Sequence, residues 1–439
     1  MWGVDAETLD LARLQFALTA AGHFLFVALT LGLATVVACV QTVAVASGNP
    51  VHHRMVRFWG QLYVINYAVG IVTGIVMEFQ FGMNWSGLGH YAGDVFGASL
   101  ALETILAFFV ESTFLGLWIF GWGRFNRWVH LGTLWVVTLT AYLSAYWILV
   151  TNGFLNNPVG HRETPDGLVL HDTAAVLTNP STLFAFGHIA AGALVTAAFF
   201  MAGVSAYHLF RRSPEHEVFR RSLRIGVFLG APAVFLTAVT GGVQFPFLAG
   251  NQPMKMAVFR RDEAEIARLQ AELTARFGPG DYMPSETWTQ LGATLMLVAF
   301  ALMLLVAGLG VVLGAIRFVV HRLRAWHVLL MAVVPLPYVA MTAGWVFREA
   351  GRQPWVIHGL LRTEDAASQL SAGQMRLSLA VFGVLFALLI AGNGYFLLRA
   401  AGRGPAAVSL GTDDTPPGTP GGDDPDGPRT RDRAPAPTY

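Results

Sequence analysis

The segment GASLALETILAFFVEST (residues 97–113) has the apolar composition of a membrane-spanning helix, yet it contains Glu103 and Glu111. A carboxylate at the centre of a bilayer costs about 3 kcal/mol on insertion scales, so intramembrane acids usually face the protein interior and carry out chemistry. In an α-helix these two would lie about 80° apart around the axis and about 12 Å apart along it. We expect both to face one interior seam with Ser112 and, on the next span, Ser144, as in a proton relay. The alternative is two neutral carboxyl groups hydrogen-bonded for packing.

The composition of the chain indicates an integral membrane protein. Of its 439 residues, 54% are hydrophobic and 13% charged, a balance outside the usual range of soluble globular domains. The formal net charge of +1 provides no basic field for binding nucleic acid. Cys39 is the single cysteine of the sequence, so no metal or redox site can depend on a pair of sulfurs.

Nine apolar stretches are each long enough to cross a bilayer, which takes about 20 mainly apolar residues. They predict an all-α integral membrane protein with nine transmembrane helices in a bundle. The approximate bounds are residues 16–46, 57–77, 95–119, 129–150, 184–206, 225–247, 290–316, 327–347 and 374–398.

Arginine is concentrated in alternate connections between the spans. GNPVHHRMVR, GWGRFNRW, FRRSPEHEVFRRSLR and RFVVHRLR are short and basic, whereas the predicted loops at 78–94 and 151–183 contain a single Arg between them. Connections rich in Lys and Arg stay in the cytoplasm. We therefore expect the N-terminus outside and, after nine spans, the C-terminus in the cytoplasm.

Two segments differ from the spans. Residues 248–288 form a long external connection with a short amphipathic helix in RRDEAEIARLQAELTARFG and with Lys255, the only lysine of the sequence. This loop is either a cap near a substrate entrance or a tolerated insertion. Residues 402–439 are rich in Pro, Gly, Asp and Thr and predict a disordered cytoplasmic tail after a membrane domain of residues 1–401.

Two histidines, His23 and His188, lie inside apolar spans. Neutral imidazole is the commonest metal ligand, and haem iron needs a strong nitrogen donor with small neighbours that admit the ring. The alternative for each is a hydrogen bond to a neighbouring helix. Met296 would complete a six-coordinate haem opposite a histidine, or it packs in the core. The small neighbours of the histidines are Ala21, Gly22, Gly187, Ala190 and Ala191.

The segment GWVFREAGRQPW (residues 344–355) gathers polar and aromatic residues at the external end of a span. Arginine and tryptophan suit the propionates and the edges of a macrocycle, and Glu349 is a candidate oxygen ligand for a high-spin iron. The alternative is an interfacial belt of Trp and Arg. The other residues of interest here are Trp345, Arg352, Gln353 and Trp355.

Taken in order, these segments resemble subunit I of the cytochrome bd-type quinol oxidases. The resemblance runs from about residue 9 to 400 and is carried by RLQFALTAAGHFLFVALTLGLA (13–34), MEFQFG (77–82), the opening segment, LSAYWILVTNG (143–153), PLP (335–337) and GRQPW (351–355). It implies that residues 1–401 are a haem-binding membrane domain with two haems b and one haem d, or a further haem b.

The resemblance also implies roles for individual residues. His23 is similar to the axial ligand of haem d, with Glu103 near or on the same iron, and Glu349 to the ligand of the high-spin haem b, with Trp345 between the neighbouring rings. His188 and Met296 match the ligand pair of the low-spin haem b. Lys255 matches a quinol-site residue of the external loop. The proton path from the cytoplasm would comprise Glu111, Glu103, Ser112 and Ser144.

The sequence departs from the family pattern around the entry of electrons. An acid of the quinol loop is replaced by Arg260, for which Glu263 or Glu265 would have to substitute. The register around Met296 requires a one-residue gap, which leaves Met303 as a less suitable alternative. An arginine and a glutamate of the family are replaced by Thr294 and Thr342.

The expected activity is quinol oxidation at the external face of a bacterial cell membrane, coupled to reduction of O2 to water with cytoplasmic protons. The expected partners are a multi-span subunit II, a small single-span subunit, quinol, O2 and membrane lipid, and no nucleic acid. One alternative is a bd-like oxygen reductase with a non-quinol electron donor. Another is an ion-coupled transporter that uses Glu103 and Glu111, which predicts inverted repeats.

Overall fold

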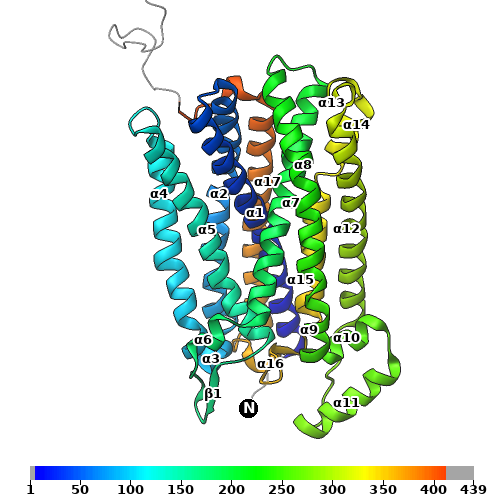
Figure 1. Cartoon of the computed structure of the whole chain (residues 1–439). Coiled ribbons are helices and arrows are strands. Elements are labelled where there is room, and N and C mark those ends of the chain that lie inside the picture. Colours follow the sequence, from blue (N-terminus) through cyan, green and yellow to red (C-terminus); the bar gives the residue numbers. More distant parts are fainter. Residues whose placement is uncertain (1–4, 412–439) are drawn as a thin grey trace, which may run out of the picture.

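The computed structural model describes residues 5–411, with the side chains of Leu106 and Ala107 left aside. Within this range nine helices are long and apolar enough to cross a membrane, as the sequence predicts. They run side by side as an elongated bundle (Figure 1). The nine spans are Ala6–Ser47, Pro50–Asn84, Ser86–Phe120, Arg127–Asn156, Thr173–Phe210, His216–Asn251, Glu286–Ala315, Arg324–Ala350 and Ala372–Arg403.

Five spans are single helices: α1 (Ala6–Ser47), α2 (Pro50–Asn84), α5 (Arg127–Asn156), α12 (Glu286–Ala315) and α17 (Ala372–Arg403). The other four are divided: α3 (Ser86–Leu102), π-helix η1 (Glu103–Phe108) and α4 (Phe109–Phe120); α6 (Thr173–Leu177) and α7 (Pro180–Phe210); α8 (His216–Gly242) and α9 (Gln244–Asn251); α14 (Arg324–Ala332) and α15 (Leu336–Ala350). The connections contain α10 (Pro253–Arg260), α11 (Glu263–Phe277), α13 (Arg317–Arg322), α16 (Thr363–Ala366), η2 (Pro405–Ala407) and two hairpins, β1 (His161–Thr164) with β2 (Gly167–Leu170) and β3 (Trp355–Ile357) with β4 (Leu361–Arg362).

Short polar side chains set where the long helices begin. Asp5 accepts a hydrogen bond from the Thr8 amide and starts α1. Asn49 caps α2, with Pro50 at its first turn. Ser371 and Gln374 form a capping box at the start of α17. These residues satisfy backbone N–H groups that a helix leaves free at its N-terminus.

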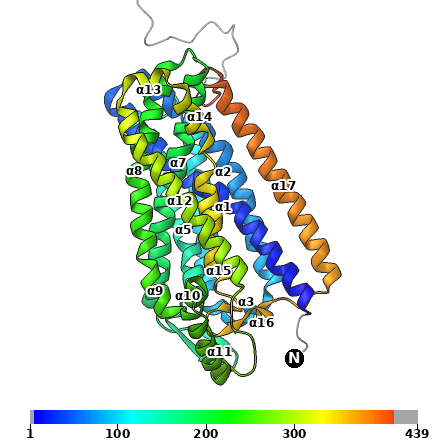
Figure 2. The same cartoon turned by 90° about the vertical axis from the view of Figure 1, so that its right-hand side faces the viewer.

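Small residues let the central helices approach closely. A Cβ on Gly32 of α1 would lie 2.1 Å from the carbonyl oxygen of Ala193 on α7, and one on Gly226 of α8 would lie 2.7 Å from that of Ala198. Small residues are common where membrane helices pack, because they bring backbones together. Helices α1 and α7 therefore form the centre, α8 packs along α7, and α17 lies at the edge beside α1 and α2 (Figure 2).

The two ends of the bundle differ. The β1–β2 hairpin, α9, α10, α11 and α16 gather at the end near residue 5, whereas α13 and the basic connections lie at the other end (Figure 1). The amphipathic helix predicted in residues 248–288 is α11. The end that carries α11 is called the α11 end below.

Two boundaries expected from sequence are wrong. Residues 78–94 are helical rather than a loop, because only Trp85 separates α2 from α3. The ordered chain also continues past residue 401: η2 follows α17, the Ser409 amide donates to Gln61 Oε1 at 2.9 Å, and Leu410 is buried. A disordered segment therefore does not begin at residue 402. The remainder of the predicted tail, residues 412–439, lies outside the described residues.

Candidate functional site

His23 lies at the contact of α1 with α2. Its Nδ1 is 2.9 Å from Thr73 Oγ1, and this hydroxyl donates to the carbonyls of Val69 and Gly70. The hydroxyl oxygen therefore accepts a hydrogen bond from the N–H group at Nδ1, and Nε2 keeps a free lone pair. A Cβ on Gly74 would lie 3.2 Å from His23 Cε1, so a larger residue would crowd the ring. A histidine fixed through one nitrogen is oriented to bind a metal through the other.

His188 on α7 has the same arrangement beside α8. Its Nδ1 lies 3.1 Å from the Thr237 carbonyl oxygen and 3.3 Å from Thr240 Oγ1. A carbonyl only accepts, so Nδ1 carries the proton and Nε2 remains a potential ligand. A Cβ on Gly241 would lie 2.9 Å from His188 Cε1. Both predicted imidazole ligands are thus held by a second group and face a glycine on the neighbouring helix.

Met296 on α12 lies against α15, where a Cβ on Gly344 would be 3.1 Å from its Sδ atom. It is half-buried, whereas Met303 belongs to the main hydrophobic core. Thr294 is exposed and Thr342 is half-buried. Of the two candidate ligands, Met296 therefore has its thioether outside the main hydrophobic core. Helices α7, α8, α12 and α15 pack together, which brings the spans of His188 and Met296 into one group.

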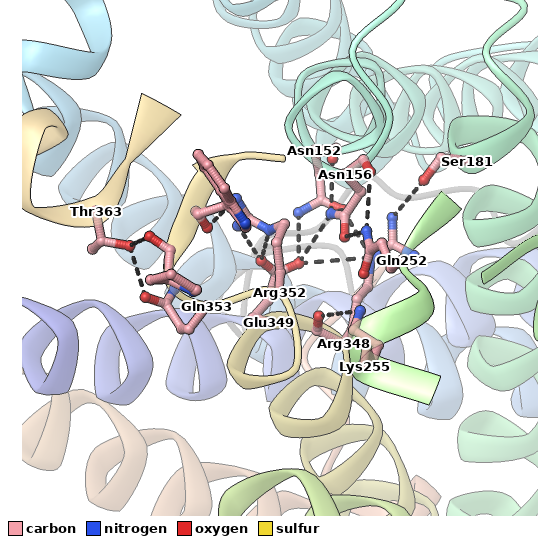
Figure 3. Close-up of polar contacts among 12 residues, drawn as sticks. Asn152, Asn156, Ser181, Gln252, Lys255, Arg348, Glu349, Arg352, Gln353 and Thr363 are labelled. Atoms are coloured by element: carbon pink, nitrogen blue, oxygen red, sulfur yellow. Dashed lines mark hydrogen bonds and ion pairs between the residues drawn. The ribbon is translucent and has the colours of Figure 1, made fainter. Parts of the chain in front are cut away.

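Glu349, at the end of α15, is the centre of a polar network (Figure 3). Its Oε2 accepts hydrogen bonds from Arg352, and its Oε1 accepts one from Asn152 Nδ2 at 3.0 Å and a longer one from Asn156 at 3.4 Å. Arg348 Nε lies 3.6 Å from Oε1. A carboxylate offers about four lone-pair positions. An iron bound to Glu349 would therefore displace one of these contacts.

The neighbours of Glu349 in sequence are also fixed. Trp345 packs edge to face on Phe24 of α1 at 5.3 Å between ring centroids, close to His23 in sequence. Arg352 is buried and donates to the Trp355 carbonyl at 3.3 Å. Gln353 Oε1 accepts a hydrogen bond from Thr363 at 2.7 Å. Among these residues, Arg352 carries the positive charge that could pair with a haem propionate. Gln353 connects the start of β3 to α16 through its hydrogen bond with Thr363.

Glu103 opens the π-helix η1 and contacts three polar side chains. Ser144 on α5 donates a short hydrogen bond to Glu103 Oε1. Thr104 Oγ1 lies 3.5 Å from Glu103 Oε2 and 2.9 Å and 3.1 Å from the two carboxyl oxygens of Glu78 on α2. The carboxyl groups of Glu78 and Glu103 adjoin each other. Two acids and two hydroxyls from α2, η1 and α5 therefore form one hydrogen-bonded group.

The π-helix changes the predicted relation of Glu103 to Glu111. A π-helical turn takes up one extra residue, so the total rotation about the helix axis from Glu103 to Glu111 falls by about 100°. The 80° offset expected for a regular α-helix therefore becomes an offset of about 20° in the opposite direction. Glu111 is buried, and Tyr67 of α2 adjoins it. The two acids share a face more closely than predicted. Ser112 does not join them, because its hydroxyl donates to the Phe108 carbonyl of its own helix at 2.8 Å.

Lys255 on α10 is buried, and its Nζ donates to the Arg348 carbonyl oxygen at 2.9 Å. Burial and the nearby Arg348 guanidinium hold the pKa of Lys255 well below its usual range. Arg260 and Glu263 are exposed, and Glu265 pairs with Arg268 at 2.7 Å. The structure therefore joins Lys255 to the Glu349 network but places neither predicted substitute acid beside it.

Sequence reasoning missed several residues of these groups. Glu78 was placed in a predicted loop, although the cost of an intramembrane acid was a usable signal. Arg348 donates to Asn152 Oδ1 at 3.0 Å and to Ser181 Oγ at 3.1 Å. Asn152 is about 200 residues from Glu349 in sequence, so nothing local indicated the contact. Thr73 likewise becomes relevant only through its contact with His23.

These groups define a class of protein. Within residues 5–411 no three His, Cys, Asp or Glu side chains converge to hold a bare metal ion. Haem iron takes four ligands from its porphyrin and needs only one or two from protein, which fits singly held imidazoles with glycines beside them. The nine-helix fold of the described residues and these singly held imidazoles fit the class of membrane proteins that carry haem.

The comparisons with known proteins give the family. The family model "Cytochrome bd terminal oxidase subunit I" matches residues 11–275 and 268–405. The chain is 36% identical to cytochrome bd ubiquinol oxidase subunit 1 of Bacillus subtilis, covering 90% of this chain and 94% of the relative. It is 32% identical to cytochrome bd-II ubiquinol oxidase subunit 1 of Escherichia coli, covering 93% and 98%.

A solved structure agrees. The bd oxidase from Geobacillus thermodenitrificans matches with a TM-score of 0.80 and 26% identity, covering 92% of this chain and all of that one. The protein belongs to the cytochrome bd terminal oxidase subunit I family. It is therefore a multi-pass protein of a bacterial membrane, an oxidoreductase of the quinol oxidase type that acts in a respiratory chain, carries haem and works with a subunit II. This family membership overturns the alternative hypothesis of an ion-coupled transporter.

Proposed function

We propose that the protein oxidises quinol at its α11 end and reduces O2 to water, by the balance of two quinols and one O2 giving two quinones and two waters. The observation that carries the proposal is the matched setting of His23 and His188, each with Nδ1 hydrogen-bonded and Nε2 left as a ligand. Its direct test is the reduced-minus-oxidised visible spectrum of the purified complex, in which haem bands are expected.

His188 with Met296 would hold a low-spin haem b, and His23 a haem d or a further haem b. Glu349 would hold a high-spin haem b after giving up one of its present contacts, with Trp345 between neighbouring rings and Arg352 paired with a propionate. The haems supply the one-electron chemistry and the oxygen-binding iron. The protein fixes the ligands through Thr73 and Thr237.

Protons for water would reach the oxygen site through the acidic group of α2, η1 and α4. Glu111 lies further along the helix from Glu103, toward the end that carries the basic connections. Ser144 holds Glu103, and Tyr67 adjoins Glu111. Because the two acids share one face, a proton could pass between them. Rows of intramembrane acids of this kind serve proton transfer in pumps and transporters. Ser112 takes no part unless its hydroxyl rotates away from the Phe108 carbonyl.

The orientation follows from charge. The arginine-rich connections at the end opposite α11 predict that this end is cytoplasmic. Quinol protons would then be released outside and water protons taken from inside, which separates charge without a pump. Subunit II, and a small single-span subunit where one is present, would cover lipid-facing helices.

A second candidate is oxygen reduction with a different electron donor. Arg260, Thr294 and Thr342 stand where the family pattern has other residues, and Arg260 and Thr294 are exposed. Turnover of the complex with menaquinol decides between the two. Oxygen uptake that depends on menaquinol supports the first function, and reducible haem without such uptake supports the second.

A further inference from the structure

His358 lies beside Lys255 at the α11 end of the bundle, just after β3. Its backbone amide donates to the Leu155 carbonyl at 2.9 Å, and its ring packs at 6.4 Å from that of Trp355. Its Nδ1 atom is buried and has no hydrogen-bond partner among residues 5–411. The main chain therefore fixes the position of an imidazole that has one nitrogen available.

The charges around the ring keep it neutral. Lys255 of α10 and Arg352 after α15 are the positive charges that act on it, and the Asn251 backbone at the end of α9 lies near the ring. Burial, followed by the positive charges of Lys255 and Arg352, lowers the pKa of His358 to about 4. In its neutral form the ring carries one proton, and the tautomer with that proton on Nε2 leaves Nδ1 as a hydrogen-bond acceptor.

Two further groups of this cluster are incompletely paired. Lys255 Nζ donates to the Arg348 carbonyl within residues 5–411, and a lysine nitrogen has further N–H groups to donate. Gln252 donates through Nε2 to Asn156, but its buried Oε1 has no partner in the described part of the chain. A Cβ on Gly351 would lie 2.6 Å from Lys255 Cε, so the lysine is held closely.

An acceptor beside an N–H donor is complementary to one end of an aromatic diol. We propose that His358 Nδ1 accepts the proton of a quinol hydroxyl while Lys255 donates to the same oxygen as it becomes a carbonyl. This inference rests on the proposed quinol oxidation and names the base for it. The O–H bond breaks and an N–H bond forms at His358, and a bound haem would serve as the oxidant that takes the electron. The second hydroxyl, at the far end of the ring, would give its proton to solvent and its electron to the haem, and His358 would release its proton to the external side before the next quinol binds.

The assignment accounts for the missing acid of the external loop. Arg260 and Glu263 are exposed, and Glu265 is committed to Arg268. His358 instead reaches the lysine from a different segment, about 100 residues further along the sequence. A base supplied from β3 makes an acid at position 260 unnecessary.

The test compares His358→Gln with His90→Gln in the purified complex. His90 is an exposed histidine of α3, so its variant controls for loss of any external imidazole. Each variant is assayed with menaquinol and with tetramethyl-p-phenylenediamine, which donates electrons but has no hydroxyl proton. We expect His358→Gln to lower kcat/KM for menaquinol on the order of 100-fold and to leave oxidation of the amine donor and the haem spectrum unchanged. His358→Glu, which restores an acceptor, should recover part of the loss.

The outcomes are distinct. If the wild-type complex oxidises only the amine donor, the proposed quinol oxidation itself is wrong. If the wild type oxidises menaquinol and His358→Gln matches it, His358 is not the base. A parallel loss with both donors, together with altered haem bands, would assign His358 a structural role and also overturn the inference.

Discussion

Replacing Thr73 by valine tests whether His23 is a metal ligand oriented by its neighbour. Thr73 Oγ1 is 2.9 Å from His23 Nδ1, and valine keeps the shape but removes the acceptor. A buried N–H without a partner costs about 1–3 kcal/mol, and loss of a group that orients a metal-binding histidine typically lowers metal affinity about 10–100-fold. We expect Thr73→Val to lower haem retention at the His23 site by about that factor.

The matched control is Thr138→Val. Thr138 is also buried in a membrane helix, but its hydroxyl donates only to the backbone carbonyls of Leu134 at 2.9 Å and Ala34 at 3.4 Å. The assay is the haem-to-protein ratio by pyridine haemochrome, with the visible spectrum, after extensive detergent washing. Thr73→Ser should behave as the wild type. Equal haem content and spectra for Thr73→Val and Thr138→Val would refute the reasoning.

Three further predictions concern the other sites. Glu78→Gln keeps the bond from Thr104 but removes one acid, so proton uptake during a single turnover should slow on the order of 100-fold if the acids act together; an unchanged rate removes Glu78 from the path. Gly241→Val should displace His188 and remove low-spin haem b bands, whereas Gly242→Val, where a Cβ meets nothing within 4 Å, should not. Between pH 7 and 5 the wild type should lose more thermal stability than His358→Gln. The pKa of His358 is lowered to about 4 in the folded protein, so the unfolded state binds the proton first as pH falls below about 6.5, which favours unfolding. Equal losses contradict this.

The spans were predictable because hydropathy acts over whole helices. Every predicted span overlaps one in the structure, since a lipid environment admits little else than continuous helices. The prediction of a loop at residues 78–94 was wrong. The polar residues of this segment suggested a loop, whereas both sides of Trp85 are helical. The replacement of an acid by Arg260 was visible in the sequence, but the spatial position of His358 was not.

Local geometry was not predictable for the acidic group. Sequence spacing assumes a regular α-helix, and nothing in ETILAF indicates the π-helix that turns Glu103 toward the face of Glu111. Of the two serines expected beside the acids, Ser144 contacts Glu103, whereas the Ser112 hydroxyl donates to a backbone carbonyl of its own helix. A serine in a membrane helix satisfies its hydroxyl on a backbone carbonyl unless a partner is near, and only the fold decides which occurs.

The most direct measurement of the central claim is the reduced-minus-oxidised spectrum and haem content of the purified complex, compared among wild type, His23→Ala and His188→Ala. The account predicts haem b and haem d bands, or bands of haem b alone, in the wild type. His188→Ala should lack the low-spin haem b, and His23→Ala should lack the oxygen-site haem and its oxygen uptake. Identical haem bands and respiration in all three proteins would contradict the assignment of both ligands.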